Sequence, residues 1–269
     1  MSPGTPPLVD THCHLFLMEA DPARVVADAV AEGVTQLVCA AIDPGTSRRS
    51  IELARAHPEV FATAGLHPHD ASRFDAEVRR DLESLAADPE VVAIGETGLD
   101  WFRMHSPRED QLGSLAWHVG LSNETGKPLV VHVREAWEDV LRLLAEEAAE
   151  RVVIHCFSGD EAIARECAQR GYWLSFAANV TYPKNPELRL AAAAAPADRL
   201  VVETDSPFLP PEGMRGRGNV PGHAWAAART LAAERGEDLT ALAGVLASNA
   251  RRAFGLPAPL DKPLVPESP

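Results

Sequence analysis

Residues 128–157 decide the fold, and they read Pro128-Leu-Val-Val-His132-Val-Arg134-Glu-Ala136-Trp-Glu-Asp-Val-Leu-Arg-Leu-Leu-Ala-Glu-Glu-Ala-Ala-Glu150-Arg-Val152-Val-Ile-His155-Cys-Phe157. The apolar runs at both ends predict short strands, and the longer segment from Ala136 to Glu150 has the composition of a helix. A strand, a helix and a second strand in succession favour two parallel strands joined by a crossover helix. Both apolar runs also lead into a histidine, His132 in the first and His155 in the second.

The same alternation repeats along the chain. Eight predicted strands occupy Val9–Leu15, Gln36–Ile42, Phe61–His67, Val91–Thr97, Pro128–Val133, Val152–Phe157, Tyr172–Phe176 and Leu200–Thr204. Predicted helices occupy Ala23–Glu32, Ser47–Ala56, Ala76–Ala87, Glu109–Thr125, Ala136–Glu150, Glu161–Arg170, Asn185–Ala195, Trp225–Arg235 and Leu239–Phe254. For 269 residues without a linker, this pattern predicts an α/β protein of one domain, a (β/α)8 TIM barrel. The rival is an open doubly wound sheet, which would normally carry a Gly-rich phosphate loop that this sequence lacks.

The two ends of the chain differ from its interior. Residues 1–7 and 256–269 are rich in proline, so we expect a disordered N-terminal tail and a Pro-rich C-terminal tail around a barrel domain of residues 8–255. The first residues lack the features of a signal peptide, and no apolar run approaches the ~20 residues of a membrane span. The four cysteines form no CxxC pair, which favours reduced thiols. We therefore expect a cytoplasmic monomer with no membrane association and no obligate protein partner.

Histidines and carboxylates follow most of the predicted strands. In Val9-Asp-Thr-His12-Cys-His14 the two histidines share one strand face, while Cys13 points into the helix layer. This pair alone is weak evidence, because core or surface histidines would produce it too. The set is stronger, since further strands end in His67, Glu96, His132, His155 and Asp205. Active sites of such barrels lie at the C-terminal ends of the strands.

This set of side chains has the chemistry of a metal site. Four histidines and two carboxylates exceed one tetrahedral site and suit two divalent ions, with ligands His12, His14, Glu96, His132, His155 and Asp205. Mixed nitrogen and oxygen ligands accept Mg, Mn, Zn, Fe or Co. Glu96 is the candidate bridge, because its carboxylate has two oxygens, and Asp205 could take a proton from an attacking water. These two carboxylates are the candidate catalytic residues.

Other polar residues have less certain roles. His67 and Arg134 are candidate contacts for a substrate phosphate, although a surface salt bridge would also explain Arg134. Glu203 could orient a histidine ligand or be a buried structural carboxylate. The formal net charge of −14 argues against a broad basic surface for duplex DNA. A nucleic-acid substrate would therefore be held locally, by metal ions and a few basic side chains.

The motifs as a set resemble the TatD family of metal-dependent deoxyribonucleases, within the amidohydrolase-like barrel superfamily. The matching blocks are Asp10–Leu15, Gly65–Pro68, Ile94–Asp100, His132–Arg134, His155–Gly159, Glu203–Phe208, Arg215–Asn219 and Asn249–Gly255. The resemblance implies metal-dependent cleavage of phosphodiester bonds in DNA, often as a 3′ exonuclease on single strands. It places metal ligands at the same six positions. Trp101-Phe102 departs from the family, which usually has a tyrosine pair there.

Two other classes of function compete with this interpretation. Another hydrolase of the superfamily could cleave an ester or amide, as in the removal of D-amino acids from tRNA. Many of its amide hydrolases bridge their metals with a modified lysine, and no lysine lies close to Glu96 in the sequence. A non-catalytic metal or scaffold protein is disfavoured by the complete ligand set.

Overall fold

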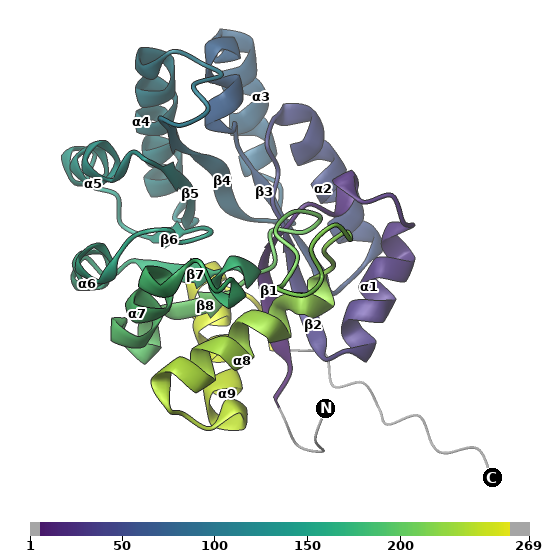
Figure 1. Ribbon diagram of the computed structural model, residues 1–269. Helices are drawn as coiled ribbons and strands as arrows, with labels where there is room; N and C mark the ends of the chain where they lie inside the picture. Colours follow the sequence, from purple (N-terminus) through teal and green to yellow (C-terminus); the bar gives the residue numbers. More distant parts are fainter. Residues whose placement is uncertain (1–5, 259–269) are drawn as a thin grey trace.

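Eight parallel strands pair in the order of the chain, with the helices outside them (Figure 1). The computed structural model describes residues 6–258. The strands are β1 (Leu8–Cys13), β2 (Val34–Cys39), β3 (Val60–Ala64), β4 (Val91–Asp100), β5 (Leu129–Arg134), β6 (Val152–Ile154), β7 (Trp173–Phe176) and β8 (Leu200–Val202). All eight predicted strands are therefore confirmed, with shifted ends.

The first and last strands meet and close the barrel. The backbone N–H of His14 donates to the carbonyl of Ser206 at 2.7 Å, and the backbone N–H of Asp205 donates to the carbonyl of His12 at 2.9 Å. The Asp10 carboxylate accepts hydrogen bonds from the backbone N–H of Thr204 at 2.9 Å and from its hydroxyl at 2.6 Å. Asp10 thus ties β1 to the segment that follows β8. This closure confirms the (β/α)8 barrel and rules out the open sheet.

The helices follow the predicted pattern closely. They are α1 (Pro22–Ala31), α2 (Pro44–Ala56), α3 (Ala76–Ala86), α4 (Arg108–Thr125), α5 (Trp137–Glu146), α6 (Glu161–Gln169), α7 (Pro186–Ala194), α8 (Ala224–Arg235) and α9 (Leu239–Phe254). The largest error is in α5, which was predicted to reach Glu150 and ends at Glu146 instead. The chain turns there because Ala148 adopts a left-handed conformation with φ of 51°.

An apolar layer fills the barrel near the N-terminal ends of the strands. Helix α9 packs against this layer, whose members are Val9, Val38, Ala93, Val130, Val153, Val201, Ala250, Ala253, Phe254 and Leu256. Leu256 lies in the predicted C-terminal tail and is nevertheless buried. The rest of that tail beyond residue 258, and residues 1–5 of the N-terminal tail, lie outside the described residues. The polar residues lie at the opposite end of the barrel, near the C-terminal ends of the strands.

Strand β4 extends beyond its predicted end and carries Glu96 in its interior. Gly98 pairs with His132 of β5 in this extension. A Cβ at Gly98 would lie 2.0 Å from the His132 carbonyl oxygen, and its φ of 143° is unfavourable for other residues. Glycine is therefore required for β4 and β5 to approach closely beside the candidate ligand His132.

Among residues 6–258, we find no helix that is both long and apolar enough to cross a membrane.

Candidate metal centre

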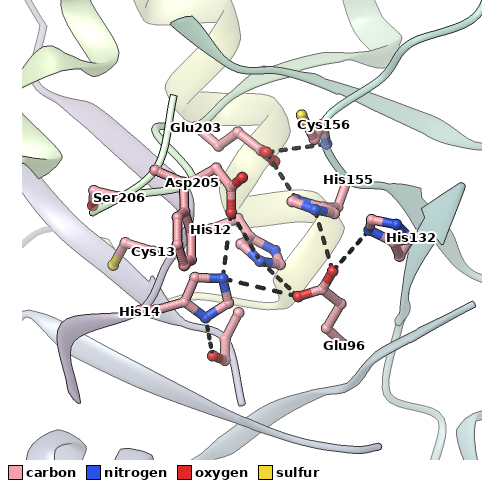
Figure 2. A network of polar contacts seen from close by, with 12 residues as sticks. His12, Cys13, His14, Glu96, His132, His155, Cys156, Glu203, Asp205 and Ser206 are labelled. Atoms are coloured by element: carbon pink, nitrogen blue, oxygen red, sulfur yellow. Dashed lines mark hydrogen bonds and ion pairs between the residues drawn. The ribbon is translucent and has the colours of Figure 1, made fainter. Parts of the chain in front are cut away.

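Glu96 lies at the centre of the polar end of the barrel, surrounded by the predicted histidines (Figure 2). Its Oε2 atom is 3.2 Å from His12 Nε2 and 3.9 Å from His14 Nε2. Asp205 completes this side, with Oδ1 at 3.3 Å from His14 Nε2 and 3.9 Å from His12 Nε2. Two imidazoles and two carboxylates therefore surround one point.

The other oxygen of Glu96 faces a different group of histidines. Its Oε1 atom is 3.1 Å from His132 Nδ1, 3.3 Å from His155 Nε2 and 3.4 Å from His67 Nε2. The two oxygens of one carboxylate thus point to two sets of nitrogen atoms, which adjoin where the His12 and His155 rings stack at 3.7 Å between centroids. This is the arrangement that a carboxylate bridging two cations requires.

Two of the histidines are held so that one nitrogen faces the centre. His14 Nδ1 is 2.8 Å from the carbonyl of Ala40, which can only accept, so its proton is assigned to Nδ1 and the lone pair to Nε2. His155 Nδ1 is 2.8 Å from Glu203 Oε1, which leaves Nε2 facing Glu96 in the same way. An imidazole that ligates a metal usually has such an acceptor on its other nitrogen.

Glu203 lies deeper in the barrel than the candidate ligands. It is fully buried, and its Oε1 also accepts a hydrogen bond from the backbone N–H of Cys156 at 3.0 Å. The side chain contacts His155 and not the space between the clusters. Of the two roles left open by the sequence, this position favours the orientation of a histidine.

His12 supplies a direct test of whether the residues fit a cation. Its side chain is 1% exposed, and within residues 6–258 neither ring nitrogen forms a hydrogen bond, although Nε2 lies 3.2 Å from Glu96 Oε2. A buried polar nitrogen without a hydrogen bond is costly, and a cation bound at Nε2 would satisfy that nitrogen. Atoms of three groups lie close enough to share an ion: His12, His14 and Glu96; His12, His155 and Asp205; and His67, Glu96 and His132. The donor set fits divalent cations.

The carboxylates at the centre are ionised. Burial alone would raise the pKa of Glu96, but the charge of His155 and the contacts with the other imidazoles around the carboxylate hold it well below its ordinary value. Burial also acts to raise the pKa of Asp205, and the hydrogen bond and charge of His14 and the charge of His155 outweigh it and lower the pKa. Negative ligands are therefore available at neutral pH, where divalent cations would take the place of protons on the histidines.

His67 was predicted to contact a substrate phosphate, but it also lies beside the candidate ligand Glu96. Its Nδ1 accepts a hydrogen bond from the backbone N–H of His69 at 3.2 Å, so its Nε2 faces Glu96. Burial lowers the pKa of His67 to about 4, and its imidazole is neutral at pH 7. In this tautomer the proton lies on Nε2, so His67 can donate a neutral N–H to a substrate, but it supplies no positive charge and no Nε2 lone pair for a cation.

Arg134 lies on the rim of the barrel mouth. It is exposed, and its guanidinium lies over the Phe102 ring at 4.2 Å from the ring centroid. Within residues 6–258 it forms no ion pair, so the salt bridge considered from the sequence is absent from the described part of the chain.

Sequence reasoning missed His69. It lines the central pocket and lies 2.8 Å from the carboxylate of Asp100, whose side chain is also 3.5 Å from His132 Nε2. The signal was present in His67-Pro68-His69, but His69 follows the strand end and belongs to a 3-10 turn, Pro68–Arg73. Attention to strand ends alone therefore excluded it.

The central pocket has a volume of about 250 Å³. Five of the six candidate ligands, all except His12, line it, and Leu17, Ile42 and Phe208 form an apolar part of its wall. Its volume is slightly below the ~300–1,000 Å³ typical of ligand pockets. The barrel and this site define the class of protein, a metal-dependent hydrolase.

Comparisons with known proteins identify the family. The family model described as TatD related DNase matches residues 9–255, so the chain belongs to the TatD family. The uncharacterized metal-dependent hydrolase TatD of Mycobacterium tuberculosis is 40% identical to it over 259 residues, which cover 93% of this chain and 98% of that protein. The protein named 3′-5′ ssDNA/RNA exonuclease TatD of Escherichia fergusonii is 34% identical over 243 residues, or 88% of this chain and 94% of that protein.

A solved structure agrees with this assignment. The crystal structure of YjjV, a TatD homologue from Escherichia coli K12, matches with a TM-score of 0.89 and 28% sequence identity. The match covers 93% of this chain and 98% of that one. Family and fold are thus supported by both sequence and structure.

Proposed function

We propose that this TatD-family hydrolase is a two-metal phosphodiesterase that removes nucleotides from the 3′ end of single-stranded DNA. The main observation behind the proposal is that the two carboxylate oxygens of Glu96 face two different sets of histidine nitrogens. One ion would be held by His12, His14, Glu96 and Asp205, and the other by Glu96, His132 and His155.

Each side chain has a defined task in hydrolysis. Bound divalent ions would supply an activated water and neutralise charge on the phosphoryl oxygens. Asp205 takes the proton of the attacking water, because it is ionised and its side chain is 15% exposed toward the pocket. His67 donates its Nε2 hydrogen to a phosphoryl oxygen. Glu203 keeps His155 in the tautomer that presents Nε2.

The pocket supports a substrate that enters by its end. A volume of about 250 Å³ is too small for a duplex and suits one terminal nucleotide. The apolar wall formed by Leu17, Ile42 and Phe208 suits the base or sugar of that nucleotide. The relative from Escherichia fergusonii, named as a 3′-5′ exonuclease of single strands, supports the polarity. No lysine lines the pocket within the described residues, so a lysine-bridged amide hydrolase is less well supported.

The test uses full-length protein loaded with Mg²⁺ or Mn²⁺ and single-stranded DNA labelled at either end. We expect stepwise shortening from the 3′ end, and at least a 1,000-fold loss of turnover in Glu96→Ala and Asp205→Asn, on the order seen when central catalytic groups are removed. A parallel reaction contains model carboxylic esters, including a D-aminoacyl ester. Cleavage of esters with DNA intact would contradict the proposal. Shortening from the 5′ end would contradict its polarity.

A further inference from the structure

The ring of Phe102 lies at the barrel mouth, outside the central pocket. It is 52% exposed, more than any other large apolar residue among residues 6–258 except Leu190 at 58%. It follows β4 directly, next to Trp101. Trp101 has a different role, because its indole N–H donates to Asp139 of α5 at 3.0 Å and Arg108 covers its ring. Of the two neighbouring aromatic residues, Trp101 packs against the helix layer and Phe102 is left open to solvent.

Two arginines lie against the Phe102 ring. The guanidinium carbon of Arg134 is 4.2 Å from the ring centroid, and that of Arg103 is 5.6 Å away. Neither arginine forms an ion pair with any of residues 6–258. A guanidinium over a ring keeps its N–H groups free at the edge, where they can meet a phosphate. An aromatic surface and two uncompensated positive charges are thus combined in a chain with a net charge of −14.

The backbone that carries Phe102 is rigid. Asp100 Oδ1 accepts hydrogen bonds from the backbone N–H groups of Phe102 at 2.9 Å and Arg103 at 2.7 Å. The N–H of Trp101 donates to the carbonyl of Arg134 at 2.9 Å. The other oxygen of Asp100 contacts His69 and lies 3.5 Å from His132. The backbone of Phe102 is therefore tied through Asp100 to the candidate metal centre.

Phe102 lies beside the candidate metal centre, since the Asp100 carboxylate contacts both the backbone of Phe102 and His132. Arg134 stands two residues beyond His132 on β5, which is about 7 Å along the strand. Phe208, six residues after β8, lines the central pocket, whereas Phe102 follows β4. A strand whose last nucleotide lies in the pocket would pass its next base over Phe102.

We propose that Phe102, Arg134 and Arg103 form a binding subsite for the penultimate nucleotide of a single strand, with its base stacked on Phe102 and its phosphate held by the arginines. This inference rests on the proposed function and extends it. Stacking on an aromatic side chain accepts every base, because each base has a π face, and it requires that the base be unpaired. The subsite would therefore select single strands without selecting a sequence.

The experiment compares Phe102→Ala with the wild type on two oligonucleotides that differ only at the penultimate nucleotide, which is either normal or abasic. On the normal strand we expect KM to rise about 5- to 150-fold, the range for loss of one stacked base, with kcat changed little. On the abasic strand the two proteins should have the same KM. Phe102→Trp should keep the low KM on the normal strand. Leu190→Ala, at an equally exposed site on α7, is the control and should change nothing.

Two further measurements separate the possible failures. The thermal stability of Phe102→Ala separates a structural role from a binding role, and its Tm should equal that of the wild type. An equal loss of kcat/KM on the abasic and the normal strand would show that Phe102 has only a structural role and would overturn the inference, as would an unchanged KM on the normal strand. If the wild type neither shortens DNA nor binds a fluorescent single strand, the proposed function itself has failed.

Discussion

Replacing Glu203 with glutamine isolates the effect of one buried charge on the candidate metal centre. Glu203 Oε1 lies 2.8 Å from His155 Nδ1, and glutamine keeps the size of the side chain. Its amide oxygen can still accept from the backbone N–H of Cys156, so the fold should be kept. His155 would lose the negative charge that raises its pKa and makes Nε2 a strong ligand.

The expected loss is about 10- to 100-fold in metal affinity, or about 1.4–2.8 kcal/mol. Competition between the protein and a chelating dye for Mn²⁺ measures it directly. Excess Mn²⁺ should restore most of the lost activity, because the substitution weakens loading and leaves the other ligands in place. The control is Glu146→Gln, a residue on α5 whose side chain is 57% exposed. Metal affinity within twofold of the wild type would refute the reasoning, and a lower Tm with unchanged affinity would show that Glu203 is purely structural.

Three further predictions follow from the structure. Gly98→Ala should lower kcat/KM on the order of 100-fold, because the added Cβ would push the backbone of His132 away from Glu96. The control is Gly113→Ala on α4, which has open space around it and should leave activity intact. Similar losses in both variants would contradict this prediction. Saturation with Mn²⁺ at about 100 times Kd should raise Tm by roughly 5–10 °C over the EDTA-treated protein in scanning calorimetry, and no shift would argue against a folded-state metal site. Asn249→Ala should lower the free energy of unfolding in urea by about 1–3 kcal/mol, because the Asn249 amide donates to the carbonyls of Ala197 and Leu200 at 2.7 Å. We expect kcat to stay unchanged. A large loss of kcat would show that the two ends of the barrel are coupled.

Much of the architecture could be predicted because local patterns and the global fold agree. The apolar runs that lead into His132 and His155 are too short for helices, and the amphipathic segment between them is too long for a strand. The alternation in His12-Cys13-His14 also holds, since the two histidines face Glu96 while Cys13 packs in the helix layer. The alternation of residues along a strand fixes the face to which each side chain points, so this feature could be predicted from the sequence alone.

Other features depend on the backbone and could not be read from residue types. Non-glycine residues Cys156 and Asp205 adopt φ values of 43° and 55°, and these left-handed conformations turn the chain at the ends of β6 and β8. No propensity predicts such a conformation at these residues. The extension of β4 to Asp100 likewise depends on the contact between Gly98 and His132, which are far apart in sequence.

The apolar layer at the N-terminal end of the barrel, which α9 covers, limits the routes by which a proton could leave. Phe254 and Leu256 lie there with Val9, Val38, Val130, Val153 and Val201, and these side chains cannot carry a proton. In the proposed function, cleavage of a diester at neutral pH would release one proton for each bond broken. That proton would have to leave through the same opening that admits the substrate, so buffer access at the mouth would become part of each catalytic cycle.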